Sequence, residues 1–202
     1  MRPPIVCGVS QQQNLSPHVS YIISPMSVNS VIMSGAFNPD KFKQVLHYII
    51  NKTESYPNVG KKVLYKLLYF NDFNYYERTE IKMTGEVYSK LEHGPAPRHF
   101  HQMIEELQAA GIIEEKTVKY YGHDQIRFCS LVAPDVSLLS ATELQHIDDT
   151  LGRYASMNGS QIEATSHKDL PWIASENKEN LDYELVFYRS ADMSVREYCG
   201  DD

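Results

Sequence analysis

The segment from Gly60 to about Arg78 restricts the fold more than any other part of the sequence, because its apolar residues repeat at helical spacing on more than one face. One stripe is aliphatic and consists of Val63, Leu64, Leu67 and Leu68. A second stripe is aromatic and consists of Tyr65, Tyr69, Phe73 and Tyr76. A helix that is apolar on several faces is buried on several faces. The sequence therefore predicts a central helix, or a helix with one side against a partner.

Helix signals lie on both sides of this segment. Asn38 is a good N-cap and Pro39 suits the first helical position, so a helix is predicted to run to about Lys52. After the central segment, Thr84 can cap a short helix that Gly94 ends. The chain is thus expected to be mainly helical up to this point.

Three further helices are expected downstream. The first covers residues 97–111, with a proline at its start and a glycine at its end. Ser140 with Glu143 forms a capping box for the second, and Ser160 with Glu163 forms one for the third.

Between residues 113 and 130 the apolar period changes from helical spacing to two, which is typical of strands. The alternating positions are Val118, Tyr120, Ile126 and Phe128, with Gly122 at the turn. Helices followed by a two-stranded wing give the element order of a winged helix. The predicted fold class is therefore mainly α with a small β-hairpin, a compact helical domain with a winged-helix-like arrangement (α+β). Residues 181–187 also alternate and are expected to be extended.

Length and composition suggest a single domain with extensions. Residues 1–36 are rich in Ser, Gln, Asn and Pro and are predicted to be a flexible or extended leader, residues 37–190 the domain, and residues 191–202 an acidic tail. No apolar run is long enough to cross a bilayer, and the 3 cysteines are scattered. A cytoplasmic protein without a disulfide framework is expected.

Charge argues against nucleic acid as the partner. Residues 1–139 carry 14 basic and 13 acidic side chains, whereas residues 140–202 carry 5 and 13, so the last third is at −8. The predicted helix over 97–111 has one arginine against two glutamates, and the hairpin sums to zero. A duplex repels such surfaces. The lysines at 41, 43, 61, 62 and 66 are expected to lie on solvated helix faces.

Several separated segments resemble the Panacea (SocA-like) antitoxin domain between about residues 40 and 190. The central segment resembles that family's helix, with a Lys-Leu-Leu-Tyr core at residues 66–69 followed by Asp72. Thr84 and Gly85, followed by Tyr88, match its Thr-Gly turn. Its Gly-Pro-x-Pro loop is matched by Gly94, Pro95 and Pro97, and its C-terminal elements by His167, Trp172 and Tyr183.

The resemblance implies a compact, mostly helical bacterial antitoxin whose partner is a protein toxin encoded nearby, and for SocA-like members also a protease or chaperone that receives the toxin. It implies no cofactor and no catalytic residue. A winged-helix transcriptional regulator that binds operator DNA is the alternative. A hydrolase built on Ser166, His167 and Asp169 is a third hypothesis, which the absence of a Gly-x-Ser-x-Gly turn disfavours.

Candidate sites can be weighed from the residues themselves. The aromatic stripe is the best candidate partner surface because tyrosines are frequent interface hot spots, but core packing is the alternative, favoured for Tyr69 and Phe73. Asp72 is expected to accept a structural hydrogen bond, from Tyr88 or a backbone amide. His167 and Trp172 are expected to close a loop over the core. The histidines at 93, 99 and 101 lack the cysteines or acidic residues that would complete a metal site.

Overall fold

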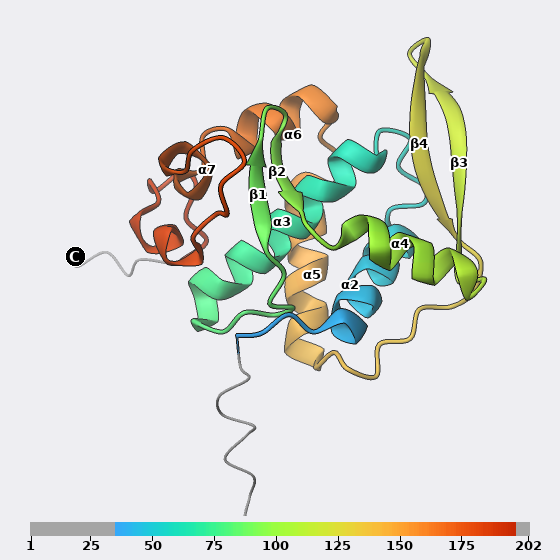
Figure 1. Ribbon diagram of the computed structural model, residues 1–202, viewed down its shortest axis with the longest axis horizontal. Coiled ribbons are helices and arrows are strands. Elements are labelled where there is room, and N and C mark those ends of the chain that lie inside the picture. Colours follow the sequence, from blue (N-terminus) through green and yellow to red (C-terminus); the bar gives the residue numbers. More distant parts are fainter. Residues whose placement is uncertain (1–34, 197–202) are drawn as a thin grey trace, which may run out of the picture.

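The computed structural model describes residues 35–196, and Figure 1 shows its helices packed around a central one. The predicted leader, except for residues 35 and 36, and residues 197–202 of the predicted tail lie outside the described residues. The elements are α2 (Pro39–Lys52), α3 (Lys61–Thr79), β1 (Tyr88–Leu91), β2 (Gly94–Pro97), α4 (Phe100–Ala109), β3 (Ile113–Tyr120), β4 (His123–Ser130), α5 (Ala141–Tyr154), α6 (Gly159–Ser166), α7 (Leu170–Ala174) and the 3-10 helix η1 (Tyr183–Tyr188).

Helix α3 is the centre of the fold, as its two apolar stripes predict. It contacts α2, α5, α6, η1 and both hairpins, and it runs through the middle of the molecule in Figure 1. Its buried side chains lie on every face and include Leu67, Phe70 and Phe73, none of which is exposed. The mainly helical fold class is confirmed, with two small two-stranded antiparallel sheets. No helix within residues 35–196 is long and apolar enough to cross a membrane.

Local capping signals predicted two helices well. Helix α2 has the predicted bounds, and the Asn38 side chain accepts a hydrogen bond from the Lys41 amide at 3.0 Å. Helix α5 begins after Ser140, whose hydroxyl accepts from the Glu143 amide while the Glu143 carboxylate accepts from the Ser140 amide. Both caps act within one turn, so neighbouring residues suffice to specify them.

The prediction of a short helix after Thr84 is wrong. Residues 88–91 form β1, which pairs with β2 in antiparallel register from Tyr88 opposite Pro97 to Leu91 opposite Gly94. Outside this pair, the Leu181 amide donates to the Tyr88 carbonyl at 2.8 Å, so a distant segment also satisfies the β1 backbone. Tertiary pairing therefore overrides the local helix signal, and Pro97 ends a strand while α4 begins only at residue 100.

Two C-terminal expectations are also corrected. The cap of α6 is Asn158, which forms a capping box with Gln161, so the box expected from Ser160 and Glu163 is wrong by two residues. Residues 183–188 form η1 rather than an extended segment, with Tyr183 and Val186 buried. Leu181, Tyr183 and Val186 all belong to the core, the last two as members of η1.

The hairpin β3–β4 is confirmed and extends beyond the helices in Figure 1. Tyr121 and Gly122 form its two-residue turn at φ values of 46° and 82°, the left-handed pair that such a hairpin requires. At its base, Phe128 is buried and Arg127 donates to the carbonyls of Glu54 and Tyr56 at 2.8 and 3.0 Å. The order of α4 and the hairpin matches a winged helix, while the winged-helix arrangement itself stays a prediction.

Gly85 provides the sharpest test of the packing. Its φ is +71°, and a β-carbon would overlap the carbonyl group of Ala36. We expect Gly85→Ala to lower the free energy of unfolding by about 1–3 kcal/mol or more through backbone strain. Gly152→Ala, in α5 with open space around it, is the matched control and is expected to raise the free energy by up to ~1 kcal/mol. Urea unfolding of both variants checks this, and equal effects would contradict it.

Candidate functional site

Asp72, Thr84 and Tyr88, three residues that match motifs of the antitoxin domain, are joined by hydrogen bonds. The carboxylate is 1% exposed, and its Oδ2 accepts hydrogen bonds from the Thr84 hydroxyl at 2.7 Å and the Tyr88 hydroxyl at 2.8 Å. The predicted hydrogen bond from Tyr88 is confirmed. Gly85 follows Thr84 and allows the chain to pass under Ala36. This cluster ties the Thr-Gly turn and β1 to α3, so its role is architectural.

The environment of Asp72 disfavours its charge. Burial raises the pKa of Asp72 to about 7, although the hydrogen bonds from Thr84 and Tyr88 lower it and the charge of Glu86 raises it further. Glu86 is itself fully buried and lies 2.9 Å from the His99 Nδ1. The carboxyl group of Asp72 is therefore protonated in the folded protein below about pH 7.

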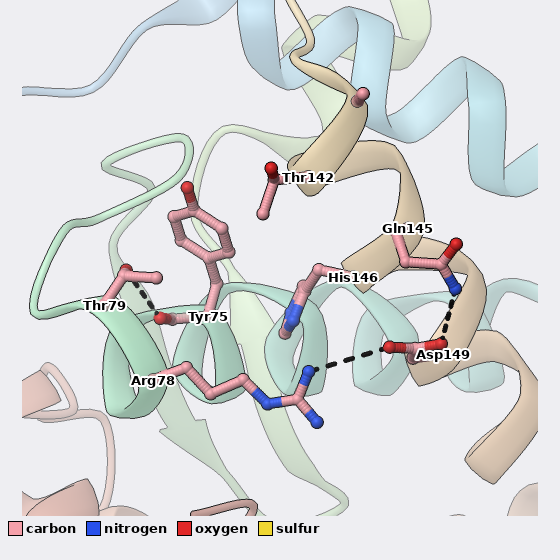
Figure 2. A pocket seen from close by; sticks show the side chains of 8 residues that line it. Tyr75, Arg78, Thr79, Thr142, Gln145, His146 and Asp149 are labelled. Atoms are coloured by element: carbon pink, nitrogen blue, oxygen red, sulfur yellow. Dashed lines mark hydrogen bonds and ion pairs between the residues drawn. The ribbon is translucent and has the colours of Figure 1, made fainter.

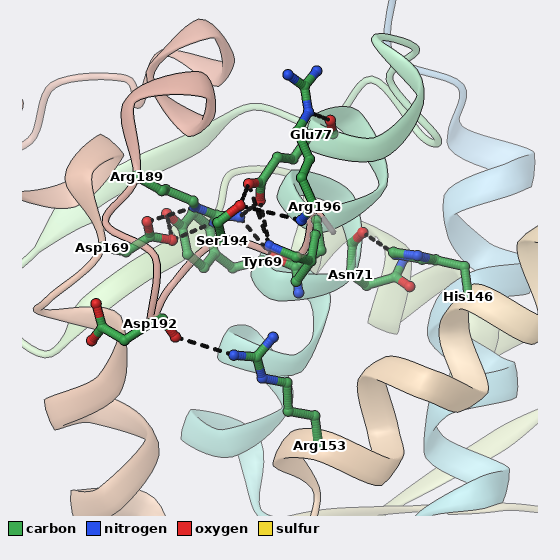
Figure 3. Close-up of polar contacts among 12 residues, drawn as sticks. Tyr69, Asn71, Glu77, His146, Arg153, Asp169, Arg189, Asp192, Ser194 and Arg196 are labelled. Carbon is green, nitrogen blue, oxygen red and sulfur yellow. Dashed lines mark hydrogen bonds and ion pairs between the residues drawn. The ribbon is translucent and has the colours of Figure 1, made fainter. Parts of the chain in front are cut away.

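A larger buried cluster surrounds Arg189 (Figure 3). Arg189 donates to both carboxylate oxygens of Asp169, at 2.8 and 2.5 Å, and to Glu77 Oε2 at 2.6 Å and Asn74 Oδ1 at 2.8 Å. The side chains of Arg189, Asp169 and Glu77 are each at most 1% exposed. The Tyr69 hydroxyl donates to Asp169 at 2.9 Å. The cluster joins α3 to the segments before α7 and after η1.

The last described residues extend this cluster. The Ser194 hydroxyl donates to Glu77, and Arg196 Nε donates to the Glu77 carbonyl at 2.6 Å. Met193 and Ser194 are buried. Residues 193–196, assigned to an acidic tail from the sequence, are therefore packed against α3.

The aromatic stripe is mainly core. Tyr69 and Phe73 are unexposed, and Phe73 stacks on Tyr183 with ring centroids 4.0 Å apart, so core packing, the alternative favoured for these two, holds. Tyr65 and Tyr76 are partly buried; Tyr65 packs edge-on against the ring at position 100, and the Tyr76 hydroxyl donates to the carboxylate at position 184. The stripe therefore offers a partner only the partly exposed side chains of Tyr65 and Tyr76.

The Gly-Pro loop makes a close approach to α3 and α6. Gly94 has a φ of +97°, and a β-carbon there would lie 2.7 Å from Ser166 Oγ and 2.8 Å from Lys66 Cε. Lys66 is 3% exposed, and burial lowers its pKa to about 8 while Glu163 raises it. The expectation that Lys66 lies on a solvated face is wrong. Pro95 follows in β2, all of whose residues are buried.

His167 and Trp172 cover the same region from outside. Their rings stack with centroids 4.0 Å apart, Lys90 Nζ lies 4.1 Å from the Trp172 ring centroid, and Trp172 Nε1 donates to the Leu91 carbonyl at 3.4 Å. These contacts tie α7 to β1, while closure of a loop over the core stays a prediction. Leu91 and Ile173 are 42% and 53% exposed beside it. We call Leu91, Trp172 and Ile173 the Trp172 face, an apolar surface available to a partner.

Two of the three residues of the hydrolase hypothesis, Ser166 and Asp169, form hydrogen bonds with other partners. Ser166 Oγ is buried and donates to the Glu163 carbonyl at 2.9 Å, and Asp169 is held by Arg189 and Tyr69. In the part of the chain that the structure describes, the three groups form no nucleophile–base contact. Metal ligands also do not gather there: residues 35–196 hold no cluster of three or more His, Cys, Asp or Glu side chains suited to a metal.

A hollow of about 400 Å³ opens between α3 and α5 (Figure 2). Arg78 and Asp149 form an ion pair of 3.7 Å across it. His146 lines it, and its Nε2 donates a hydrogen bond of 2.9 Å to the Asn71 carbonyl. Burial lowers the pKa of this imidazole. The hollow is wide open and its polar groups pair mostly with one another.

Comparison with known proteins identifies the family. A family model described as "Antitoxin SocA-like, Panacea domain" matches residues 64–173. The chain belongs to this SocA-like antitoxin family. No curated protein and no solved structure matches the chain. The matched part of this SocA-like protein runs from α3 through α7 and contains Asp72, Asp169 and Trp172, whereas Arg189 lies beyond it.

Sequence reasoning missed the most deeply buried ionic group. Arg189 and Glu77 are separated by 112 residues, and neither has a charge partner in its local sequence that would predict a buried ion pair. Asp169 precedes Leu170 and Pro171, which signals a helix start but not an ion pair. A buried arginine has no periodicity of its own, so no sequence signal marks it.

We expect Arg189→Met to lower the free energy of unfolding by about 3–5 kcal/mol, because two buried carboxylates lose their counter-charge. Arg78→Met removes the exposed ion pair to Asp149 and is expected to cost about 1 kcal/mol or less. Urea unfolding followed by circular dichroism compares them. Similar losses in the two variants would show that the Arg189 cluster is not stabilised as described.

The raised pKa of Asp72 leads us to expect an unusual pH dependence of the free energy of unfolding. Its folded pKa is about 7 and its ordinary value 3.8, so between these pH values the folded state binds more protons than the unfolded state. Stability attributable to this group is therefore present at low pH and lost as pH rises from about 4 to 7. Relative to Asp72→Asn, the native protein should lose stability over this range. Urea unfolding at pH 4.5 and 7.5 measures the difference, and a constant or opposite difference contradicts it.

Proposed function

We propose that this protein is an antitoxin that neutralises a protein toxin encoded nearby by direct, stoichiometric binding, and that it performs no chemistry itself. The observation that carries the proposal is the match of residues 64–173 to the SocA-like antitoxin family. Presentation of the bound toxin to a protease or chaperone in the cytoplasm is the finer part of the proposal and rests on the same family.

The distribution of side chains supports a binding role. The strongly interacting charged groups, Glu77, Asp169 and Arg189, are buried and hydrogen-bonded within the fold. Large apolar side chains are instead exposed on the Trp172 face and at Tyr121, which is 87% exposed. Exposed aromatic and aliphatic groups are the usual anchors of protein interfaces.

The transcriptional regulator receives less support. On the hairpin, Lys116 pairs with Glu114 and Lys119 with Asp124, so little positive charge is free for phosphates. On α4, Glu106 pairs with a lysine of α2. Recognition of DNA requires basic or amide groups free to reach phosphates and base edges.

Co-expression with the product of the adjacent reading frame tests the proposal. We expect that product alone to arrest growth, this protein to restore growth, and the two to co-purify after nuclease treatment and in high salt. Arg189→Met, which is expected to destabilise the fold, should restore growth less well than the native protein, whereas Arg78→Met should restore it. Growth arrest that persists despite normal levels of both proteins would reject the antitoxin function.

A further inference from the structure

A second hollow lies at the opposite end of α3 from the Arg189 cluster. It has a volume of about 620 Å³ and lies between the beginning of α3, the beginning of α6 and the tip of the β3–β4 hairpin. We call it the wing pocket. Its wall includes Lys61, Lys62, Tyr120, Tyr121, His123 and Ser160.

The wing pocket carries unpaired positive charge in an acidic protein. The whole chain has a net charge of −7. No ion pair or side-chain hydrogen bond engages Lys61 or Lys62 within the described range of 35–196, whereas Lys41 and Lys43 on α2 are paired with carboxylates. The first turn of α3 holds no acidic residue, and the helix amino terminus adds positive potential. Asp124 also lines the pocket, but it is paired with Lys119 at 2.9 Å. The free charges of Lys61 and Lys62 therefore make the pocket complementary to negative charge.

The walls of the wing pocket are held in place. Gly60 lets the hairpin approach α3, since a β-carbon there would lie 2.5 Å from Gln125 Cγ. Gln125 Nε2 donates to the Asn58 carbonyl at 3.3 Å, and Arg127 anchors the same strand to the carbonyls before α3. A preformed site loses less conformational entropy on binding.

Aromatic surface lies next to the charge. Tyr120 and Tyr121 pack edge to face with ring centroids 4.7 Å apart, and Tyr121 stands at a φ of 46° with its ring in solvent. An exposed tyrosine beside two free lysines offers both apolar contact and charge pairing.

We infer that the wing pocket binds an extended acidic segment of the protein that the antitoxin neutralises. Carboxylates of the segment pair with Lys61 and Lys62, and an apolar side chain of the segment packs on Tyr121. The inference rests on the proposed function and adds the chemistry of the partner. Nucleic acid fits less well, because two free lysines neutralise too few phosphates to hold a duplex against the charge of the chain.

Charge reversal tests the inference. We expect Lys61→Glu with Lys62→Glu to weaken binding of the purified product of the adjacent reading frame at least about tenfold, measured by calorimetric titration. Lys168→Glu with Lys178→Glu, which lie outside the pocket and change the net charge equally, should alter the affinity by less than about twofold. The first variant should also be at least as stable as the native protein, because acidic residues suit the first turn of α3.

Cross-linking identifies the segment directly. A variant carrying p-benzoylphenylalanine in place of Tyr121 should cross-link to the toxin through a peptide rich in Asp and Glu. Unchanged affinity of the Lys61→Glu, Lys62→Glu variant, a cross-linked peptide without acidic residues, or displacement of the toxin by duplex DNA would each overturn the inference while leaving neutralisation intact. If the native protein does not bind the toxin at all, the proposed function and the inference both fail.

Discussion

The rest of the structure depends on one buried arginine. Arg189 holds Asp169 and Glu77 within hydrogen-bonding distance in an environment that excludes water, and the segment of residues 193–196 packs on the same carboxylate of Glu77. Charges buried in this way persist only when they are paired and hydrogen-bonded. The cluster therefore fixes three stretches of chain far apart in sequence, and it makes the residues beyond the family match part of the same packed body.

Helix α3 explains why so many residues of the family resemblance are architectural. Asp72 receives the Thr-Gly turn and Tyr88, while Lys66 lies under the Gly-Pro loop. These motif residues join α3 to the Thr-Gly turn and to the β1–β2 hairpin. A glycine such as Gly94 is needed there because the loop passes too close to α3 and α6 for any side chain. What the motifs specify is a rigid scaffold, whose exposed surfaces are left free to suit a partner.

The sequence predicted those features that neighbouring residues determine. The caps of α2 and α5, the apolar faces of α3 and the hairpin turn at Gly122 follow from short-range patterns. The β1–β2 pair was missed because residues 178–181 complete it from across the chain. Likewise, the hydrogen bond from Tyr88 to Asp72 joins residues only 16 positions apart and could be predicted. The ion pair between Glu77 and Arg189 joins residues 112 positions apart, and no local pattern indicates it.

The charged side chains at the two ends of α3 differ in burial and pairing. At its carboxyl-terminal half, Glu77 is buried and paired with Arg189. At its amino terminus, Lys61 and Lys62 add positive charge where the helix dipole makes it unfavourable, at a cost of about 0.3–1 kcal/mol each. Carboxylates at these two positions would stabilise the helix. A residue choice that lowers stability next to a preformed pocket is typical of a binding site, because natural proteins depart from local rules chiefly where function requires it.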